Sequence, residues 1–222
     1  RFNSVSSQYQ NSISLIGAVA RPGNYQWYQG KRISDVLKSV RGDLLPQADL
    51  SYGLVIREIN INGDIEAHQF DVAQAIIKNP ENNLALKAND KIIVFSRFEE
   101  KEAEKSALAN MALSQEQQEQ QLKAEQWHTY QQKEFEKYIG INQEEEFIFE
   151  ENKALTIAEI SKRKAKEEAE LELKPEDYAL FSRHNLLAPI IAKFKQQASV
   201  EQAMQLVEIS GNVTFPGVYP LM

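Results

Sequence analysis

The chain has 222 residues, enough to bury at least one sizeable core, and its shares of hydrophobic (42%) and charged (26%) residues are ordinary for a globular protein. It has no cysteine, which excludes disulfides, thiolate metal sites and thiol catalysis, and no apolar run is long enough to span a bilayer. The net charge is −7, and it comes from residues 99–174, which hold 19 of the 32 acidic residues. Because neither this part nor the remainder of the chain has a basic face, we do not expect a nucleic-acid partner.

The first expected element is a strand that enters a Pro-Gly turn, and this pattern occurs twice. Residues 17–25 return 194 positions later as residues 211–219, and both copies fit G-x-V-x-x-P-G-x-Y. Alternating apolar residues precede each copy, at 13–16 and at 207–209. Pro fixes its own φ, and Gly takes the φ above zero that a type II turn needs. The duplication predicts a structural repeat whose second copy is only beginning, so we expect the chain to be a piece of something longer.

The remainder of the first 98 residues alternates between short helices and strands. An Asn-Gly pair at 62–63 is the strongest short hairpin signal available, and a turn at 87–90 precedes the last strand. Strands with covering helices over this length fit an α+β domain with a mixed sheet. The expected elements are a helix at 35–40 capped by Ser34 and ended by Gly42, a strand at 52–61, a strand at 65–70, a helical turn at 72–77 and a strand at 92–95.

The character of the chain changes at residue 99. Residues 99–174 have no proline and are dense in Glu, Gln, Lys and Ala, which are strong helix formers. A capping box at 156–159 predicts a second helix that Pro175 ends, and Ser182 caps a third that runs to about residue 198. Helices between two β-rich parts favour an antiparallel helical hairpin. The first helix has an apolar stripe, interrupted by a Gln-rich stretch: Leu108, Met111, Leu122, Trp127, Tyr130 and Tyr138.

Four landmarks occur in order along the first part of the chain. They are the Pro-Gly opening, the Ile-Ser-Asp-Val-Leu helix at 33–37, Arg57 on a strand before the Asn-Gly pair, and the closing Leu-Lys-Ala-Asn-Asp-Lys-Ile at 86–92. Together they resemble the soluble-ligand-binding β-grasp (SLBB) family. That family occurs in outer-membrane polysaccharide export proteins, where repeated β-grasp units build a periplasmic oligomeric ring or channel. The segment 182–198 also looks like the helix that precedes a later repeat in long export proteins.

The resemblance implies an α+β fold with three parts. These are an SLBB β-grasp (ubiquitin-like) domain at 12–98, an acidic helical insertion at 99–206 that forms a long hairpin, and the first strand of a second β-grasp repeat at 207–222. The strands near 12–20 and 92–96 are then expected to pair, with a helix across the sheet. The second copy is expected to pair with a sheet edge or to be held by helix contacts.

Two positions depart from the family pattern. Asn89 stands where the family usually has Gly in the closing turn, and Asn tolerates a left-handed conformation, so the turn is expected to survive. Arg41-Gly42 stands where the family usually has a Gly pair, so that loop is expected to differ in shape.

Catalysis finds little support in the residues. His68, His128 and His184 are too scattered for a recognisable ligand motif, and there is no phosphate-binding glycine loop and no G-x-S-x-G elbow. We therefore expect a protein that is not an enzyme and that uses no cofactor and no metal.

The ligand-binding candidates lie mainly beside the first turn. Tyr25, Trp27 and Tyr28 offer apolar faces with polar tips to a sugar, and Arg21 and Arg57 would suit acidic sugars. Tyr25, which recurs as Tyr219, is expected in the core, whereas Trp27 fits either a core or a binding position. Arg57 is expected to be structural. On the long helix, Trp127 is interpreted as a packing residue or as an oligomer contact.

The sequence and its resemblance together predict a non-enzymatic component of capsule or exopolysaccharide export. It would act in the periplasm, associated with the outer membrane, through self-association into a ring, contact with other export subunits or contact with polysaccharide. The alternative is a structural adaptor whose acidic helical arm binds a protein partner.

Overall fold

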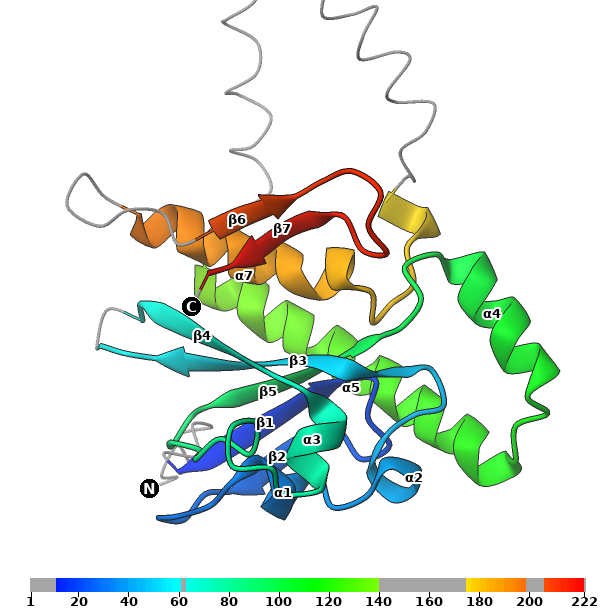
Figure 1. The fold of residues 1–222 in the computed structure, drawn as a ribbon, viewed down its shortest axis with the longest axis horizontal. Helices are drawn as coiled ribbons and strands as arrows, with labels where there is room; N and C mark the ends of the chain where they lie inside the picture. Colours follow the sequence, from blue (N-terminus) through cyan, green and yellow to red (C-terminus); the bar gives the residue numbers. More distant parts are fainter. Residues whose placement is uncertain (1–10, 61–62, 140–174, 199–205, 222) are drawn as a thin grey trace, which may run out of the picture.

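The computed structural model describes residues 11–60, 63–139, 175–198 and 206–221 (Figure 1). The expected helix that opens at 156–159 lies outside these residues, as does the second arm of the expected helical hairpin. In chain order the elements are β1 (Ser12–Gly17), β2 (Gly23–Gln26), α1 (Ile33–Val36), α2 (Val40–Asp43), β3 (Ala48–Glu58), β4 (Ile65–Phe70), α3 (Val72–Ile76), β5 (Lys91–Ser96), α4 (Lys101–Asn110), α5 (Gln115–Ile139), the 3₁₀ turn η1 (Pro175–Asp177), α7 (Arg183–Gln197), β6 (Leu206–Ile209) and β7 (Gly217–Pro220).

Five strands form one mixed sheet in the order β2-β1-β5-β3-β4. β1 and β5 run parallel, with Leu15 opposite Ile92, and every other neighbouring pair in this sheet is antiparallel. The expected pairing of the segments 12–20 and 92–96 is therefore confirmed. The chain has the α+β architecture with a mixed sheet that the order of helices and strands predicted.

Both faces of the sheet are covered by helices. In Figure 1, α1, α2 and α3 lie on one side of the sheet, and α5 and α7 lie on the other. The central strand β5 is accordingly buried from Ile92 to Ser96, as expected for a strand with no solvent-facing side. The sheet and the helices that follow it share one core, to which the later part of the chain contributes Ala124, Phe181, Leu186, Leu187, Ile190 and Phe194.

The expected helix at 35–40, capped by Ser34, is wrong. The helix there is α1, which begins after Arg32, whose backbone N–H donates to the Asp35 carboxylate at 2.8 Å. Ser34 is buried inside α1, and its hydroxyl accepts a hydrogen bond from the Asn83 amide at 3.0 Å. Since this hydroxyl is bound to another part of the chain, it does not cap the helix.

A second short helix, α2, occupies the place where the first was expected to end. Ser39 caps it, because its hydroxyl accepts the Gly42 N–H at 3.1 Å, so Gly42 lies within a helix instead of ending one. The Asp43 carboxylate accepts the N–H groups of Lys38 and Ser39 at 2.8 and 2.9 Å. These local bonds divide the expected single helix into two.

The other elements of the first part lie close to their expected positions. β4 and β5 match, while β3 begins four residues before the expected strand at 52–61. Asn89 adopts a φ of 68° in the closing turn, so its left-handed conformation is confirmed. Gly63 of the hairpin has a φ of 76°, and Asn62 lies outside the described residues.

The acidic region begins with two helices where one long helix was expected. α4 ends at Asn110, and α5 starts after Ser114, whose hydroxyl accepts the Gln117 N–H at 3.3 Å. The third expected helix is confirmed as α7, with Ser182 as its N-cap and Ala198 as its C-cap. No helix in the described ranges is long and apolar enough to cross a membrane.

The second copy of the motif forms a hairpin of its own. β6 and β7 pair antiparallel in a two-stranded sheet that lies against α7 (Figure 1). The ring of Tyr219 meets that of Tyr52 edge to face, with centroids 5.9 Å apart, and the Gln69 side-chain amide donates to the Pro220 carbonyl at 3.1 Å. The contact of β7 with α7 confirms the expected helix contacts, and side chains of β3 and β4 hold the segment as well.

The two copies have the same local geometry. Ile13 pairs with Tyr25 in the first hairpin, and Val207 pairs with Tyr219 in the second, a register that the 194-residue offset reproduces. The glycine that opens each motif has a φ of 98° or 97°, and the glycine after each proline has a φ of 146° or 148°. In both copies the tyrosine hydroxyl donates to the carbonyl four residues earlier, at 2.5 and 3.0 Å. The motif is thus a structural repeat.

We expect Gly17→Ala to destabilise the protein more than Gly211→Ala. Both glycines have the same positive φ, which costs a side chain about 1–3 kcal/mol. A Cβ on Gly17 would also lie 2.0 Å from the Val94 carbonyl oxygen, whereas nothing lies within 4 Å at Gly211. Urea unfolding should show an additional loss of about 1–3 kcal/mol for Gly17→Ala. Equal losses for the two variants would contradict the close approach of β1 and β5.

Candidate functional site

The five expected ligand-binding residues do not form one site. Arg21, Tyr25, Trp27 and Tyr28 surround the first Pro-Gly turn and β2, and Arg57 lies on β3. Trp27 and Arg57 nevertheless bind successive carbonyls of one loop: the Trp27 indole N–H donates to the Leu86 carbonyl at 2.7 Å, and Arg57 Nη2 donates to that of Ala85 at 3.1 Å. Both residues therefore organise the segment that leads into β5.

The aromatic residues after the turn are already engaged. Tyr25 and Trp27 are half-buried and pack against the core, and burial raises the pKa of the Tyr25 hydroxyl. Tyr28 is exposed, but the Lys31 ammonium lies 5.1 Å from the centre of its ring. Burial lowers the pKa of Lys31, whose ammonium also donates to the Gln26 carbonyl. The face of Tyr28 is thus occupied by a cation of the protein itself.

Arg57 forms a buried, two-bond ion pair with Asp90. Arg57 Nε and Nη2 donate to the two carboxylate oxygens of Asp90 at 2.9 and 2.8 Å, and Asp90 is fully buried. The hydrogen bonds that Arg57 donates to Asp90 raise the pKa of the guanidinium. Asp90 also accepts the Lys87 N–H at 2.7 Å, so the ion pair fixes the closing turn that contains Asn89. This geometry gives Arg57 a structural role.

Arg21 is the most accessible of the five residues. Its side chain is 68% exposed, and its guanidinium pairs with the Asp43 carboxylate, which is nearly buried. Although burial raises the pKa of Asp43, hydrogen bonds from Arg21 and from the N–H groups of Ser39 and Lys38 bring it below its ordinary value. Asp43 is therefore ionised, and its carboxylate holds the Arg21 guanidinium beside α2.

A groove lies between the first Pro-Gly turn and the N-terminal half of α5. We call it the turn groove; it has a volume of about 660 Å³, and it is lined by Arg21, Glu116, Gln120, Lys123 and Trp127 together with neighbouring residues. The Trp127 ring stacks on Tyr130, with centroids 5.4 Å apart, and its indole N–H has no hydrogen-bond partner among the described residues. An aromatic ring beside amides and charges of both signs is suited to binding a polar, ring-containing ligand.

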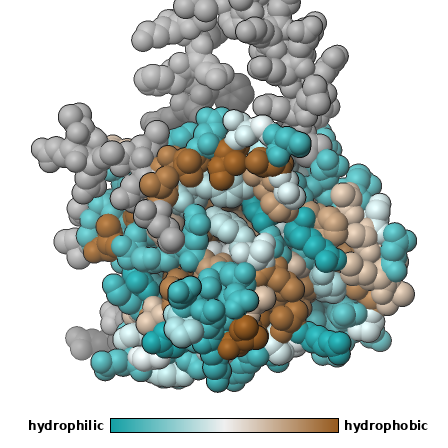
Figure 2. Space-filling model, viewed as in Figure 1, coloured by the Kyte–Doolittle hydropathy of each residue, from teal (hydrophilic) through white to brown (hydrophobic). Residues whose placement is uncertain are grey.

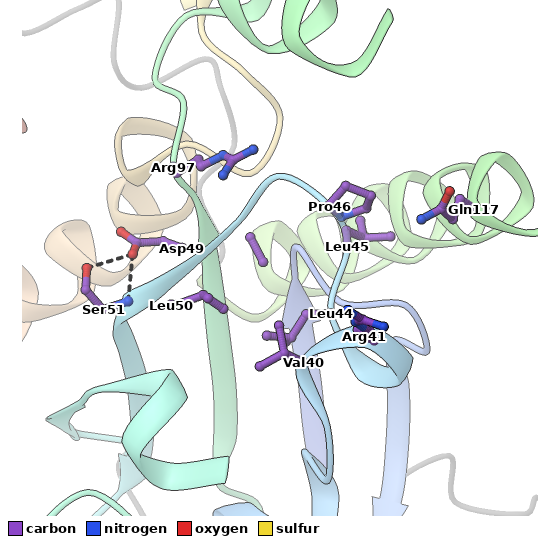
Figure 3. A pocket seen from close by; sticks show the side chains of 11 residues that line it. Val40, Arg41, Leu44, Leu45, Pro46, Asp49, Leu50, Ser51, Arg97 and Gln117 are labelled. Atoms are coloured by element: carbon purple, nitrogen blue, oxygen red, sulfur yellow. Dashed lines mark hydrogen bonds between the residues drawn. The ribbon is translucent and has the colours of Figure 1, made fainter. Parts of the chain in front are cut away.

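A second hollow, of about 600 Å³, lies between α2, the start of β3 and α5 (Figure 3). Its lining is largely aliphatic, with Leu45 and Leu50 in the wall, and Arg41 and Arg97 come from opposite sides. Asp49 also lines it, but its carboxylate accepts hydrogen bonds from Ser51 and from Arg183. The described residues contain no cluster of three or more histidines and carboxylates that could hold a metal.

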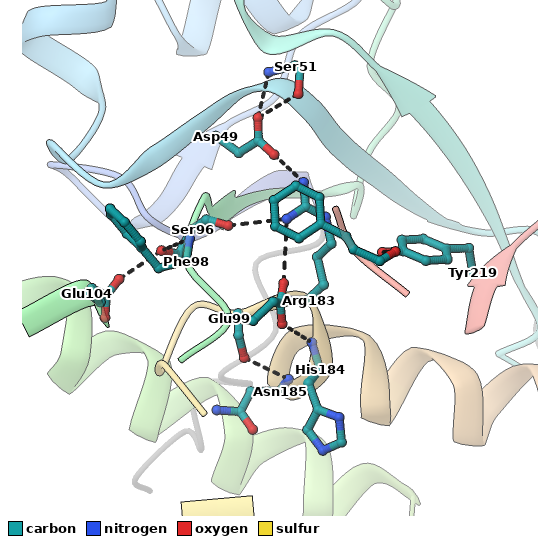
Figure 4. A network of polar contacts seen from close by, with 12 residues as sticks. Asp49, Ser51, Ser96, Phe98, Glu99, Glu104, Arg183, His184, Asn185 and Tyr219 are labelled. Atoms are coloured by element: carbon teal, nitrogen blue, oxygen red, sulfur yellow. Dashed lines mark hydrogen bonds and ion pairs between the residues drawn. The ribbon is translucent and has the colours of Figure 1, made fainter. Parts of the chain in front are cut away.

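Arg183, at the start of α7, is the centre of a polar network that sequence reasoning missed (Figure 4). Its guanidinium pairs with the Asp49 carboxylate, lies 3.5 Å from Glu99, and donates to the Ser96 carbonyl at 3.4 Å. The ring of Phe215, in the second Pro-Gly turn, covers the guanidinium at 3.5 Å. Because arginine is usually exposed, no residue pattern marks this one as buried.

We expect Arg57→Ala to be far more destabilising than Arg21→Ala. Removing Arg57 leaves the fully buried Asp90 carboxylate without its cation, a loss of about 3–5 kcal/mol. The Arg21 side chain is mostly exposed, so water screens its ion pair, and its loss is expected to cost about 1 kcal/mol or less. Urea unfolding of both variants measures the difference, and similar losses would refute the structural assignment of Arg57.

His128 on α5 is expected to make stability fall at mildly acidic pH. Burial against Phe181 lowers its pKa, and its Nδ1 atom has no partner among the described residues. The unfolded chain then takes up a proton near pH 6.5 that the folded chain does not, so this contribution is complete above pH 6.5 and declines as the pH falls.

Unfolding free energies measured between pH 8 and 5 should show this decline, with a slope of at most about 1.4 kcal/mol per pH unit. The slope should be smaller in His128→Leu. His184→Gln is the matched control, because His184 is exposed, and it should keep the slope of the parent. A parent slope that His128→Leu leaves unchanged would assign the effect to another group.

Comparisons of the chain with protein-family models, with curated proteins and with solved structures find no match. The function proposed below therefore depends on residue patterns and on the geometry described above.

Proposed function

We propose that residues 12–98 are a β-grasp unit of the SLBB type, and that the protein is a non-enzymatic component of capsule or exopolysaccharide export. The sheet order β2-β1-β5-β3-β4, with a parallel central pair and helices across one face, supports this proposal. The ordered landmarks from the Pro-Gly opening to the closing turn support it as well. The protein would then act in the periplasm, associated with the outer membrane.

The observation that carries the proposal is the matched pair of Pro-Gly turns. The two hairpins share backbone angles, register and the tyrosine hydrogen bond. Tyr219 is buried in the core, and Tyr25 is half-buried and packs against it. Repeated units in one chain present similar faces to their neighbours and so build extended assemblies. We therefore assign the function to assembly first and to glycan contact second.

We assign glycan contact to the turn groove and not to Trp27. The indole N–H of Trp27 is bound to Leu86, whereas the turn groove offers the ring of Trp127 and the cations of Arg21 and Lys123. Sugar rings would stack on the indole, and the carboxylates of an acidic polysaccharide would pair with the two cations.

One observation favours the alternative of an adaptor. α4 has no buried residue, and Met111 at its end is substantially exposed, so this helix offers a surface to a protein partner. α5 and α7, in contrast, pack on the sheet and cannot act as a separate arm.

The two tryptophans allow each candidate surface to be tested separately. In Trp27→Phe the only indole lies at the turn groove, and in Trp127→Phe the only indole lies beside β2. We expect titration with an acidic capsule-type polysaccharide to change the fluorescence of Trp27→Phe but not that of Trp127→Phe. Arg21→Ala, made in Trp27→Phe, should weaken this binding about tenfold, because a charge-assisted contact is lost.

Tyr28→Ala is the matched control, since it removes an exposed aromatic residue outside the turn groove. It should leave the binding unchanged. A response only in Trp127→Phe would move the glycan site to β2. If acidic and neutral polysaccharides alike give no response in either variant, glycan contact is refuted and the adaptor is favoured.

A further inference from the structure

The hollow between α2, the start of β3 and α5 has an aliphatic wall, and we call it the α2 hollow. Its volume of about 600 Å³ is typical of sites that bind small molecules. Figure 2 shows a mostly hydrophilic surface on which hydrophobic side chains gather in a few patches. In the α2 hollow, Val40 and Leu50 are each 39% exposed, and Leu44, Leu45 and Ala48 line it as well. The wall therefore offers apolar area that a ligand would cover.

The cations of the α2 hollow differ from the other described arginines. Most arginines bind an oxygen atom of the protein through the guanidinium group: Arg21, Arg57 and Arg183 pair with carboxylates, and Arg32 donates to a carbonyl. Arg41 and Arg97 are exposed, and their guanidinium groups form no ion pair or hydrogen bond with any residue that the structure describes. Arg97 lies over the ring of Phe98, at 5.1 Å from its centre, a contact that uses none of its N–H groups. Both arginines line the α2 hollow, from opposite sides (Figure 3).

The carboxylate in the lining, that of Asp49, is already bound within the protein. It accepts the N–H and the hydroxyl of Ser51 at 2.8 and 2.7 Å, and it pairs with the Arg183 guanidinium. Asp49 is only 6% exposed. The accessible charges of the lining are therefore the two guanidinium groups of Arg41 and Arg97, and arginine keeps its charge at every pH at which proteins fold.

We propose that the α2 hollow binds a soluble small molecule that has an anionic group and an aliphatic chain. A guanidinium group binds a carboxylate or a phosphate through two parallel N–H bonds, so the anionic group lies at Arg41 or Arg97. The chain then covers Val40 and Leu50, and burial of its methylene groups strengthens the binding. The α2 hollow shares no lining residue with the turn groove, so this proposal depends neither on glycan contact nor on a role in export.

The test titrates the whole chain with octyl phosphate below its micelle concentration and measures binding by isothermal calorimetry. We expect saturable binding at one site. From butyl to octyl phosphate the affinity should rise, by up to about fourfold for each methylene group that enters the α2 hollow. The double variant Arg41→Gln/Arg97→Gln should bind octyl phosphate about tenfold more weakly or worse, because charge-assisted hydrogen bonds are lost. The two single variants then show which arginine holds the anionic group.

Lys38→Gln/Lys87→Gln is the matched control, because it removes two exposed cations that do not line the α2 hollow. It changes the net charge by the same amount and should bind octyl phosphate as the parent does. All four substituted side chains are exposed, so both double variants should keep the urea midpoint of the parent. Octylammonium, which has the same chain and the opposite charge, should not bind.

Three results would overturn the proposal: no saturable binding of octyl phosphate, binding that Arg41→Gln/Arg97→Gln leaves unchanged, or equal binding of octylammonium. Binding to phosphatidylglycerol vesicles without binding of monomeric octyl phosphate would overturn it too, because the surface would then contact a membrane and not a soluble ligand. Arg21→Ala, which weakens the expected glycan contact, should leave octyl phosphate binding unchanged, so the two proposals can fail separately.

Discussion

The Val94 carbonyl oxygen accepts the Ala18 N–H at 2.8 Å, and this bond brings the backbone of β5 so close to Gly17 that no side chain fits between them. The contact joins the first strand of the sheet to the last and makes β5 its central strand. β5 is buried on both faces between the two helical layers, and α7 packs on it. Glycine at position 17 thus allows the close parallel pairing of β1 with β5 in the centre of the sheet.

The residue before the proline of the motif has a different role in each copy; it is Arg21 in the first and Phe215 in the second. Arg21 points outward to Asp43 and borders the turn groove, whereas Phe215 covers the guanidinium of Arg183. Through Arg183, the second turn is connected to β3, β5 and the segment before α4 (Figure 4). Arg183 and the apolar core are thus two of the connections that hold α7 and the second hairpin to the first unit, beside the Gln69 hydrogen bond to Pro220.

Local signals in the sequence predicted most elements and few of the contacts between them. Ser182 and the residues after it identified α7 because a cap and an apolar pattern are local features. The division of α1 from α2 was missed, because it depends on backbone N–H groups that donate to the carboxylates of Asp35 and Asp43, and many acidic residues could accept such bonds. At the site, the aromatic residues near the turn were recognised, but the approach of Trp127 to Arg21 results from the packing of α5 on β1, which no short pattern encodes.

The hydrogen bond from each motif tyrosine to the carbonyl four residues earlier has a consequence for the order of assembly. It closes the turn with atoms that are neighbours in the chain, so the entropy lost in forming it is small. The parallel partner of β1 is separated from it by most of the unit, and bringing it into place is slower. We therefore expect the first hairpin to acquire its register before β5 pairs with β1.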